Sequence, residues 1–198
     1  MKLIIASNNA HKVVEIREIL SQDFSEMVTL KEAGLDIDVV EDGKTFLENA
    51  VKKAETVLIA SGFSAALADD SGLIVDAIGG APGVYSARYA GEGHNDTDNN
   101  AKLMQDMSSV SDERRSCRFA CAIALARLGR ETVTAIGYCE GRLLREAHGN
   151  NGFGYDPYFY YEPFSKTFAE LSPEQKNSIS HRKRALEALK EKLEQEKI

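Results

Sequence analysis

Residues 65–78 read AALADDSGLIVDAI, two apolar runs separated by four small or acidic residues. Residues 65–68 have the composition of a short buried strand, and residues 73–78 predict that a strand resumes after the break. The four residues between the runs, Asp69-Asp70-Ser71-Gly72, are typical of a turn. The pattern therefore predicts two carboxylates at the end of a buried strand.

The segments on either side alternate between strand and helix patterns. Further strands are predicted at residues 2–6, 27–31, 117–125 and 132–138, and helices after residue 9, at 45–60, 96–107, from 172 and through 185–193. The helix at 45–60 has the clearest signals, because Thr45 and Glu48 form a T-x-x-E capping box and Gly62 suits its end. Glycine-rich loops are expected at 79–93 and 150–156. Interspersed strands and helices favour an α/β sheet with helices on its faces.

Length and composition narrow the class of protein. The 198 residues correspond to one domain, 43% of them are apolar and 28% charged, and the net charge is −7. An acidic chain is unlike a general nucleic-acid or membrane-surface binder. The longest apolar run, 119–126, is far shorter than the roughly 18 residues of a membrane span, and the apolar start is too short for an export signal. We expect a cytoplasmic protein whose three cysteines are reduced and structural.

A first polar cluster lies where the first strand feeds the first helix. It consists of Ser7, Asn8, Asn9, Ala10, His11 and Lys12. Free backbone N–H groups and the positive end of the helix dipole favour phosphate there, and Lys12 adds a charge. The glycines of a P-loop are missing, so a helix that is merely capped, by Asn8 or Asn9, is the alternative.

The second cluster is the acidic pair Asp69-Asp70. Carboxylate oxygens suit Mg²⁺, and one carboxylate could also orient or deprotonate a water molecule. A polar turn is the structural alternative. Asp70-Ser71-Gly72 also matches the D-[ST]-G of aspartic proteases, but such enzymes need two copies and the chain has one, so a protease would have to be a symmetric dimer.

Two further clusters lie toward the end of the chain. In residues 150–157, glycines allow close approach of a ligand, Phe153 or Tyr155 offers a ring for stacking, and Asp156 can accept hydrogen bonds. Lys176 and residues 180–184 form a basic group near a helix start, which is unfavourable against the dipole unless an anionic or carbonyl-bearing ligand lies there. A turn with core aromatics and a solvated basic helix are the respective alternatives. Glu41 and Lys53 are weaker candidates.

Taken together, these segments resemble the inosine triphosphate pyrophosphatase family, also called dITP/XTP pyrophosphatases. The resemblance rests on SNNAHKVVEI (7–16), LADDSGLIVDAIGGAPGVYSARYAG (67–91), GFGYDPYF (152–159) and KNSISHRKRAL (176–186), in family order over nearly the whole chain. It implies one α/β domain over residues 1–198, with a long twisted mixed sheet, flanking helices and two lobes around a central cleft. It also implies a homodimer.

The resemblance implies a reaction and a role for each cluster. The reaction is hydrolysis of ITP, dITP and XTP to the monophosphate and pyrophosphate with Mg²⁺, which cleanses the nucleotide pool. Residues 7–12 and Lys53 should hold the triphosphate, Glu41 and Asp70 the Mg²⁺, and Asp70 should be the base. The substrate contacts implied elsewhere are Ser71, Phe153, Gly154, Tyr155, Asp156, Lys176, His181 and Arg182. Whether Asp69 also binds the metal stays open.

Two other functions are kept beside this one. One is a pyrophosphatase for another modified nucleotide, and the other is a sensor that binds nucleotide without hydrolysis. A sensor would be expected to lack the acid pair or Lys12, all of which are present. Release of pyrophosphate from ITP, with and without Mg²⁺, separates these hypotheses.

Overall fold

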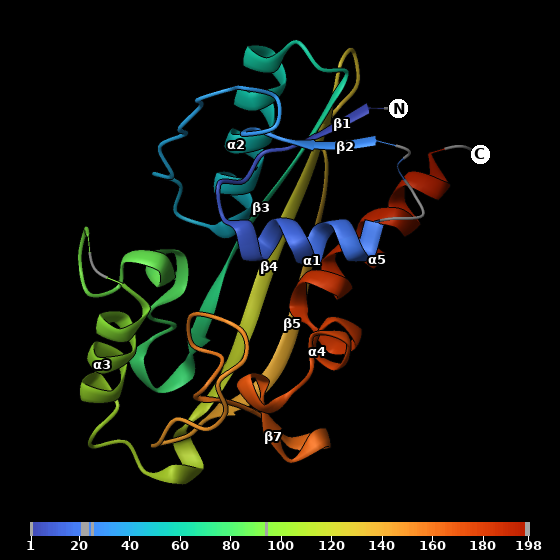
Figure 1. Ribbon diagram of the computed structural model, residues 1–198. Coiled ribbons are helices and arrows are strands. Elements are labelled where there is room, and N and C mark those ends of the chain that lie inside the picture. The colour runs from blue at the N-terminus through green and yellow to red at the C-terminus, as the bar shows by residue number, and fades with distance from the viewer. Residues whose placement is uncertain (1, 21–23, 25, 94, 197–198) are drawn as a thin grey trace. The chain divides into compact units, whose positions relative to one another are not determined.

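The computed structural model describes residues 2–20, 24, 26–93 and 95–196 (Figure 1). Its strands are β1 (Lys2–Ile5), β2 (Glu26–Thr29), β3 (Ala65–Val75), β4 (Ser116–Arg127), β5 (Val133–Leu143), β6 (Phe159–Tyr161) and β7 (Lys166–Thr167). Its α-helices are α1 (Ala10–Leu20), α2 (Phe46–Ser61), α3 (Asp96–Asp106), α4 (Pro173–Ile179) and α5 (His181–Gln195). Short 3₁₀ helices occur at Asp76–Ile78, Gly83–Arg88, Asp112–Arg114, Glu162–Phe164 and Phe168–Glu170.

Within these described residues, seven strands form one mixed sheet in the order β2-β1-β3-β4-β5-β6-β7. β1 pairs in parallel with two neighbours, so that Leu3 lies opposite Met27 of β2 and opposite Ala65 of β3. β6 pairs antiparallel with β5 and with β7. The expected mixed sheet with flanking helices is confirmed.

The chain divides into two compact units, each assembled from segments that are distant in sequence. The first unit contains Met1–Asp70, Cys121–Gly137 and Arg182–Ile198, and the second contains Ser71–Ala120 and Tyr138–His181. β3, β4 and β5 each supply residues to both units.

In the first unit, the side chains of β3 alternate between two apolar layers, as the period of a strand requires. Ala65 and Leu67 belong to a layer with residues of α1 and α5. Ala66 and Ala68 belong to the other layer, with residues of α2. Accordingly α2 lies apart from α1 and α5 in Figure 1. The next two residues of the strand, Asp69 and Asp70, therefore face opposite layers.

The start and end of α2 follow the sequence signals. Thr45 Oγ1 accepts a hydrogen bond from Glu48 N at 3.1 Å, and the Glu48 carboxylate accepts one from Thr45 N at 3.2 Å, which completes the predicted capping box. Gly62 ends the helix in the left-handed conformation with φ 69°, a conformation that glycine adopts without strain. The buried face between these caps includes Ala50, Ala54 and Val57.

The second unit has an aromatic core. The ring centroids of Phe119 and Phe159 are 4.6 Å apart, and those of Phe159 and Phe168 are also 4.6 Å apart. Leu103 and Met107, at the end of α3, pack into the same core. Offset and edge-on pairs of this kind stabilise a core beyond the area they bury.

The turn predicted at residues 69–72 is wrong, because β3 runs without a break from Ala65 to Val75. Gly72 lies inside the strand, where a Cβ atom would come within 2.3 Å of Ser86 Oγ and 2.6 Å of Gly83 O. The glycine is therefore needed for the close approach of the Gly83–Arg88 segment. The two carboxylates are tolerated in a buried strand because partners from other elements contact them.

Three other boundaries differ from the predictions. β5 extends to Leu143, because the alternation of buried and exposed residues continues past Tyr138 through buried Cys139. The loop predicted at 79–93 contains the 3₁₀ helix Gly83–Arg88. The second strand begins and ends earlier than expected, at Glu26–Thr29.

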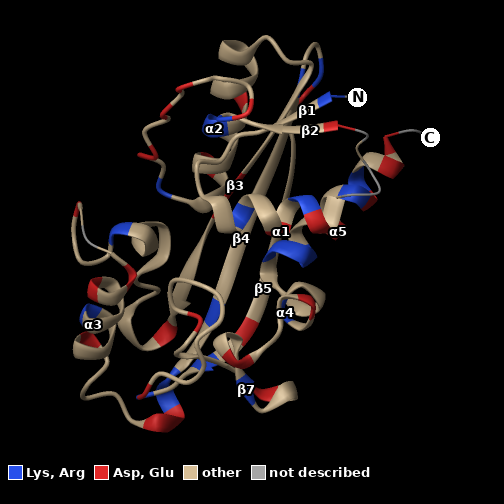
Figure 2. Ribbon diagram, in the orientation of Figure 1, with Lys and Arg blue, Asp and Glu red and all other residues tan. Residues whose placement is uncertain are grey.

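Charged residues of both signs are intermixed along α5, where Lys and Arg lie among Glu (Figure 2). The three cysteines are buried, and burial raises the pKa of the Cys121 thiol to about 12. Among the described helices, none is long and apolar enough to cross a membrane.

Candidate functional site

Asp70 is a buried carboxylate on the α2 side of β3. It is 5% exposed, and its Oδ2 accepts a hydrogen bond from Asn49 Nδ2 of α2 at 2.9 Å. Burial raises the pKa of Asp70, the negative charge of Glu41 raises it further, and Lys12 and the bond from Asn49 oppose this. A carboxylate whose pKa is raised is a better proton acceptor, which suits a general base.

Asp69 has different surroundings on the opposite side of the strand. Its side chain is fully buried, and its Oδ2 lies 3.2 Å from Lys12 Nζ and 3.2 Å from Arg182 Nη2. Burial alone would raise the pKa of Asp69, but the charges of Lys12 and Arg182 outweigh it and hold that pKa well below its usual range. Asp69 is thus a permanent anion that anchors two cations.

Arg182 is held from two sides. Its guanidinium contacts Asp69 and also the carboxylate of Glu15 from α1, and the whole residue is 1% exposed. Burial works against its charge, but the two carboxylates raise the pKa of Arg182 further above its ordinary value. The contact between α5 and β3 is therefore an ion-pair network as well as an apolar layer.

The start of α1 exposes polar groups, as the first cluster predicts. Asn9 Oδ1 accepts hydrogen bonds from His11 N at 3.0 Å and from Lys12 N at 3.2 Å, so Asn9 rather than Asn8 caps the helix. Ser7 Oγ accepts a further bond from Asn9 N at 3.2 Å. Asn8, Asn9, Ala10 and His11 are exposed, and Lys12 reaches from this turn to Asp69.

Glu41 and Lys53 lie in the same cluster. The ammonium of Lys53, from α2, contacts the Glu41 carboxylate on the segment before that helix. Burial would lower the pKa of Lys53, but the charges of Asp69 and Glu41 raise it. Lys53 therefore stays cationic, close to three carboxylates.

The donor set around Asp70 fits a magnesium ion. Within the described residues, no group of three or more His, Cys, Asp or Glu side chains is arranged to hold a metal ion unaided. Glu41 and Asp70 are near enough for the charge of one to raise the pKa of the other, a repulsion that a divalent cation relieves. Mg²⁺ commonly takes one or two carboxylates and completes its shell with water and substrate phosphate.

In the second unit, Asp156 organises the predicted stacking loop. Its Oδ2 accepts hydrogen bonds from Phe153 N at 2.9 Å and from Lys176 Nζ of α4 at 2.7 Å, and the residue is 2% exposed. Lys176 Nζ also lies 4.5 Å from the centroid of the Phe153 ring, a cation–π contact. Gly152, with φ 77°, leaves no room for a side chain, since a Cβ would come within 2.1 Å of Asp156 Oδ2.

The peptide that follows Phe153 is held by α3. Gly154 N donates to Asp96 Oδ2 at 2.7 Å, and Gly154 O accepts from Asn100 Nδ2 at 2.9 Å. Tyr155 lies in the core, where its hydroxyl donates to Ser86 O at 2.7 Å and burial raises its pKa. Of the two rings expected to stack on a base, Phe153 is the one outside this core, and it is half-buried.

Two other predicted contacts lie in the second unit. His181 is 5% exposed, and its ring stacks on Phe119 with centroids 4.9 Å apart and planes at 16°. Ser71 is half-buried on β3, directly after Asp70 in sequence. Both positions adjoin the first unit along the chain, at the peptide bonds Asp70-Ser71 and His181-Arg182.

The structure thus brings the predicted residues together in two groups. The first unit contains Lys12, Glu41, Lys53, Asp70 and Arg182, and the second contains Phe153, Asp156 and Lys176. Sequence reasoning gave no role to Asn49, Glu15, Asp96 and Asn100. A signal existed for Asn49, because a polar residue interrupts the apolar face of an otherwise well-patterned helix.

This fold is that of a known family. The sequence matches the Ham1 family over residues 3–192, and the chain belongs to that family.

Curated relatives are similar over nearly their whole length. A dITP/XTP pyrophosphatase of Clostridium perfringens is 51% identical over 197 residues, covering 97% of this chain and 97% of the relative. One from Desulforamulus reducens is 52% identical over 188 residues, covering 94% and 92%. Among solved structures, the Staphylococcus aureus Ham1 protein aligns with a TM-score of 0.88 at 41% identity, over 99% of this chain and 100% of that one.

Proposed function

We propose that this chain hydrolyses ITP, dITP and XTP to the nucleoside monophosphate and pyrophosphate, and so removes non-standard purine nucleotides from the nucleotide pool. The observation that carries the proposal is Asp70, a buried carboxylate of raised pKa beside Glu41, Lys12 and Lys53. Support comes from full-length relatives, about half identical to this chain, that are named dITP/XTP pyrophosphatases.

The first unit is assigned the triphosphate. Residues 8–11 at the start of α1 are exposed, and the positive end of the helix dipole there favours phosphate oxygens. Lys12 and Lys53 supply positive charge, and both already balance carboxylates of the cluster. Ser7 supports the same turn through its bond from Asn9 N.

Glu41 and Asp70 are assigned Mg²⁺. When bound, the ion would neutralise charge on the phosphates and polarise the reacting phosphorus. Asp69 is left out of the metal site, because its Oδ2 faces the other side of β3 and contacts Lys12 and Arg182. These contacts instead favour a role for Asp69 in holding the two cations.

The chemical step is a proton transfer coupled to attack by water. Asp70 accepts a proton from water, the water oxygen bonds to the α-phosphorus, and the bond between that phosphorus and the bridging oxygen breaks. Pyrophosphate leaves with the bonding electron pair. Lys12 and Lys53 offset its charge, which is the electrostatic stabilisation that phosphoryl-transfer enzymes depend on.

The second unit is assigned the purine. Phe153 offers the stacking ring, and Lys176 and Asp156 fix the loop on which that ring lies. Gly154 and Tyr155 shape the same loop. Ser71 and His181 of this unit are kept as substrate contacts, and so is Arg182 of the first unit. A donor such as His181 or Arg182 would pair with the carbonyl at position six of a deaminated purine.

The test is release of pyrophosphate from ITP with purified protein. We expect turnover with Mg²⁺, none in EDTA, and full recovery when excess Mg²⁺ is restored. Undiminished turnover in EDTA would exclude the magnesium assignment. Binding of ITP without turnover under any metal condition would instead indicate a nucleotide sensor.

We further propose that the chain is a homodimer in the cytoplasm, as the family resemblance implies. Light scattering coupled to size exclusion measures the mass directly. A mass near 21.7 kDa, that of one chain, would contradict the dimer.

A further inference from the structure

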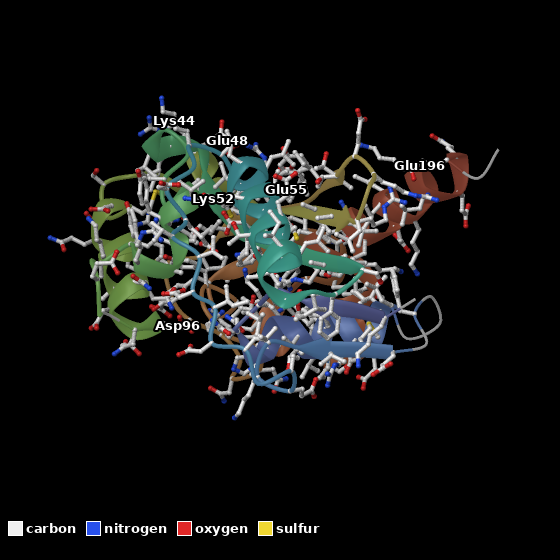
Figure 3. All side chains as sticks on the ribbon, turned by 90° about the horizontal axis from the view of Figure 1, so that it is seen from above. Lys44, Glu48, Lys52, Glu55, Asp96 and Glu196 are labelled. Atoms are coloured by element: carbon white, nitrogen blue, oxygen red, sulfur yellow. The ribbon has the colours of Figure 1, made fainter. Side chains whose placement is uncertain are left out.

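Asn49 is a buried polar residue next to the proposed catalytic carboxylate. It lies on the first turn of α2, is 1% exposed, and is the one polar residue on the buried face of that helix. Glu48, Lys52 and Glu55 lie on the exposed side of α2 (Figure 3). A buried amide is costly unless both of its ends are hydrogen-bonded, so the partners of Asn49 indicate why it is there.

The two ends of the Asn49 amide contact two different parts of the cluster. Oδ1 accepts a hydrogen bond from Gly43 N at 2.7 Å, and Nδ2 donates one to Asp70 Oδ2 at 2.9 Å. A backbone N–H can only donate and an ionised carboxylate can only accept. These partners therefore permit one orientation of the amide, and that orientation satisfies both.

The segment before α2 is fixed against the helix around this bond. A Cβ atom on Gly43 would come within 2.6 Å of Asn49 Oδ1 and 2.9 Å of Glu48 Cβ, so only glycine allows the approach. The next peptide is held as well, since Lys44 N donates to Glu48 Oε2 at 2.6 Å. Glu41 lies two residues before Gly43 on this segment.

We infer that Asn49 is a positioning residue that sets the separation between Glu41 and Asp70, the two carboxylates assigned to magnesium. The inference rests on the proposed function. One rigid amide links Asp70 directly and links Glu41 through the backbone at Gly43. Residues that orient metal ligands in this way commonly change metal affinity or activity by about 10–100-fold when they are replaced.

The substitution Asn49→Asp separates this role from simple packing. It keeps the shape and the acceptor for Gly43 N, but it replaces the donor to Asp70 by a second carboxylate. Asn49→Ala removes both bonds, and Gly43→Ala displaces the Glu41 segment while it keeps the Asn49 and Asp70 side chains. We expect each variant to lower kcat for ITP by about 10–100-fold, while KM for ITP changes much less.

A direct binding measurement complements turnover. The α,β-imido analogue of ITP, which cannot be hydrolysed at the reacting bond, is titrated calorimetrically into the protein with and without Mn²⁺. The ratio of the two dissociation constants measures how much the metal contributes to binding. We expect this ratio to be large in the wild type and to shrink by about 10-fold or more in the Asn49 and Gly43 variants.

Asn99 provides a matched control. It is 2% exposed, its Oδ1 accepts from Ala90 N at 2.7 Å, and its Nδ2 donates to Ala87 O at 3.1 Å. Asn99→Asp should lower the melting temperature, because it places a carboxylate in a buried position. It should leave unchanged both kcat and the ratio of the analogue's dissociation constants with and without Mn²⁺.

The outcomes separate the hypotheses. The inference would be overturned if the Asn49 and Gly43 variants lost stability but kept the wild-type kcat and the wild-type ratio of dissociation constants. Asn49 would then only support the fold. A wild type with no metal effect on analogue binding would overturn the magnesium assignment itself, and the inference with it. A wild-type metal effect that only the Asn49 and Gly43 variants lose would support both.

Discussion

Asp69 and Asp70 are adjacent in sequence and chemically unlike, because successive side chains of a strand point to opposite faces. Asp69 contacts Lys12 and Arg182 and has a lowered pKa, whereas Asp70 contacts Asn49 and has a raised one. Two carboxylates whose pKa values are shifted in opposite directions are suited to two different roles. One anchors cations, and the other is able to accept a proton.

Asp70→Asn should abolish turnover while the fold survives. Asparagine keeps the shape and much of the hydrogen bonding but cannot accept the proton, and general-base catalysis contributes about 10²–10⁴-fold. Steady-state kinetics on ITP should show kcat at least about 100-fold lower. Asp76→Asn serves as the control, because Asp76 is exposed and lies directly after β3, outside the cluster. A variant retaining more than roughly a tenth of wild-type kcat would mean that water is activated elsewhere.

Arg182→Ala should be strongly destabilising. It removes the guanidinium that contacts Asp69 and Glu15, and leaving buried carboxylates without their partner costs about 3–5 kcal/mol. Arg142, an exposed residue whose Nε lies 3.7 Å from Glu162 Oε1, gives a comparison, since exposed pairs contribute about 0–1 kcal/mol. Urea denaturation measures both. Equal losses for Arg182→Ala and Arg142→Ala would show that the buried network adds nothing.

Among the elements, α2 depends most clearly on its caps. Thr45→Ala removes the acceptor for Glu48 N and should lower the free energy of unfolding by about 1 kcal/mol. Thr56→Ala, at an exposed position inside the same helix, should be neutral or slightly stabilising because alanine is the better helix former. The melting temperature should therefore fall in Thr45→Ala and stay the same or rise in Thr56→Ala. A Thr45→Ala melt equal to that of Thr56→Ala would contradict the role of the cap.

The same elements show what could be predicted from sequence. The caps of α2 and the Ser172-Pro173 start of α4 depend on residues three positions apart, so local patterns predict them. The turn prediction at residues 69–72 was wrong because the two carboxylates are stabilised by Lys12, Arg182 and Asn49, which are distant in sequence. Asn49 was missed for the same reason, since its role depends on Asp70, 21 positions away.

At the scale of the whole molecule, we expect the protein to hydrolyse ITP more efficiently than ATP. A buried donor that pairs with the carbonyl at position six would face an amino group in adenine and lose about 1–3 kcal/mol or more. A steady-state panel should therefore give kcat/KM for ITP and XTP at least about 10-fold above that for ATP. GTP shares the carbonyl, so any preference for ITP over GTP must come from exclusion of the amine at position two. Equal rates for ITP and ATP would rule out base recognition of this kind.

The interleaving of the two units has a consequence for how the protein is made. The second unit draws on residues up to His181, whereas the first needs the segment that begins at Arg182. Because a chain leaves the ribosome from its N-terminus, the half that starts first is finished last. Until Arg182 has emerged, Asp69 lacks one of the two cations that balance it. Asp69 is therefore synthesised 113 residues before Arg182, one of its neutralising partners.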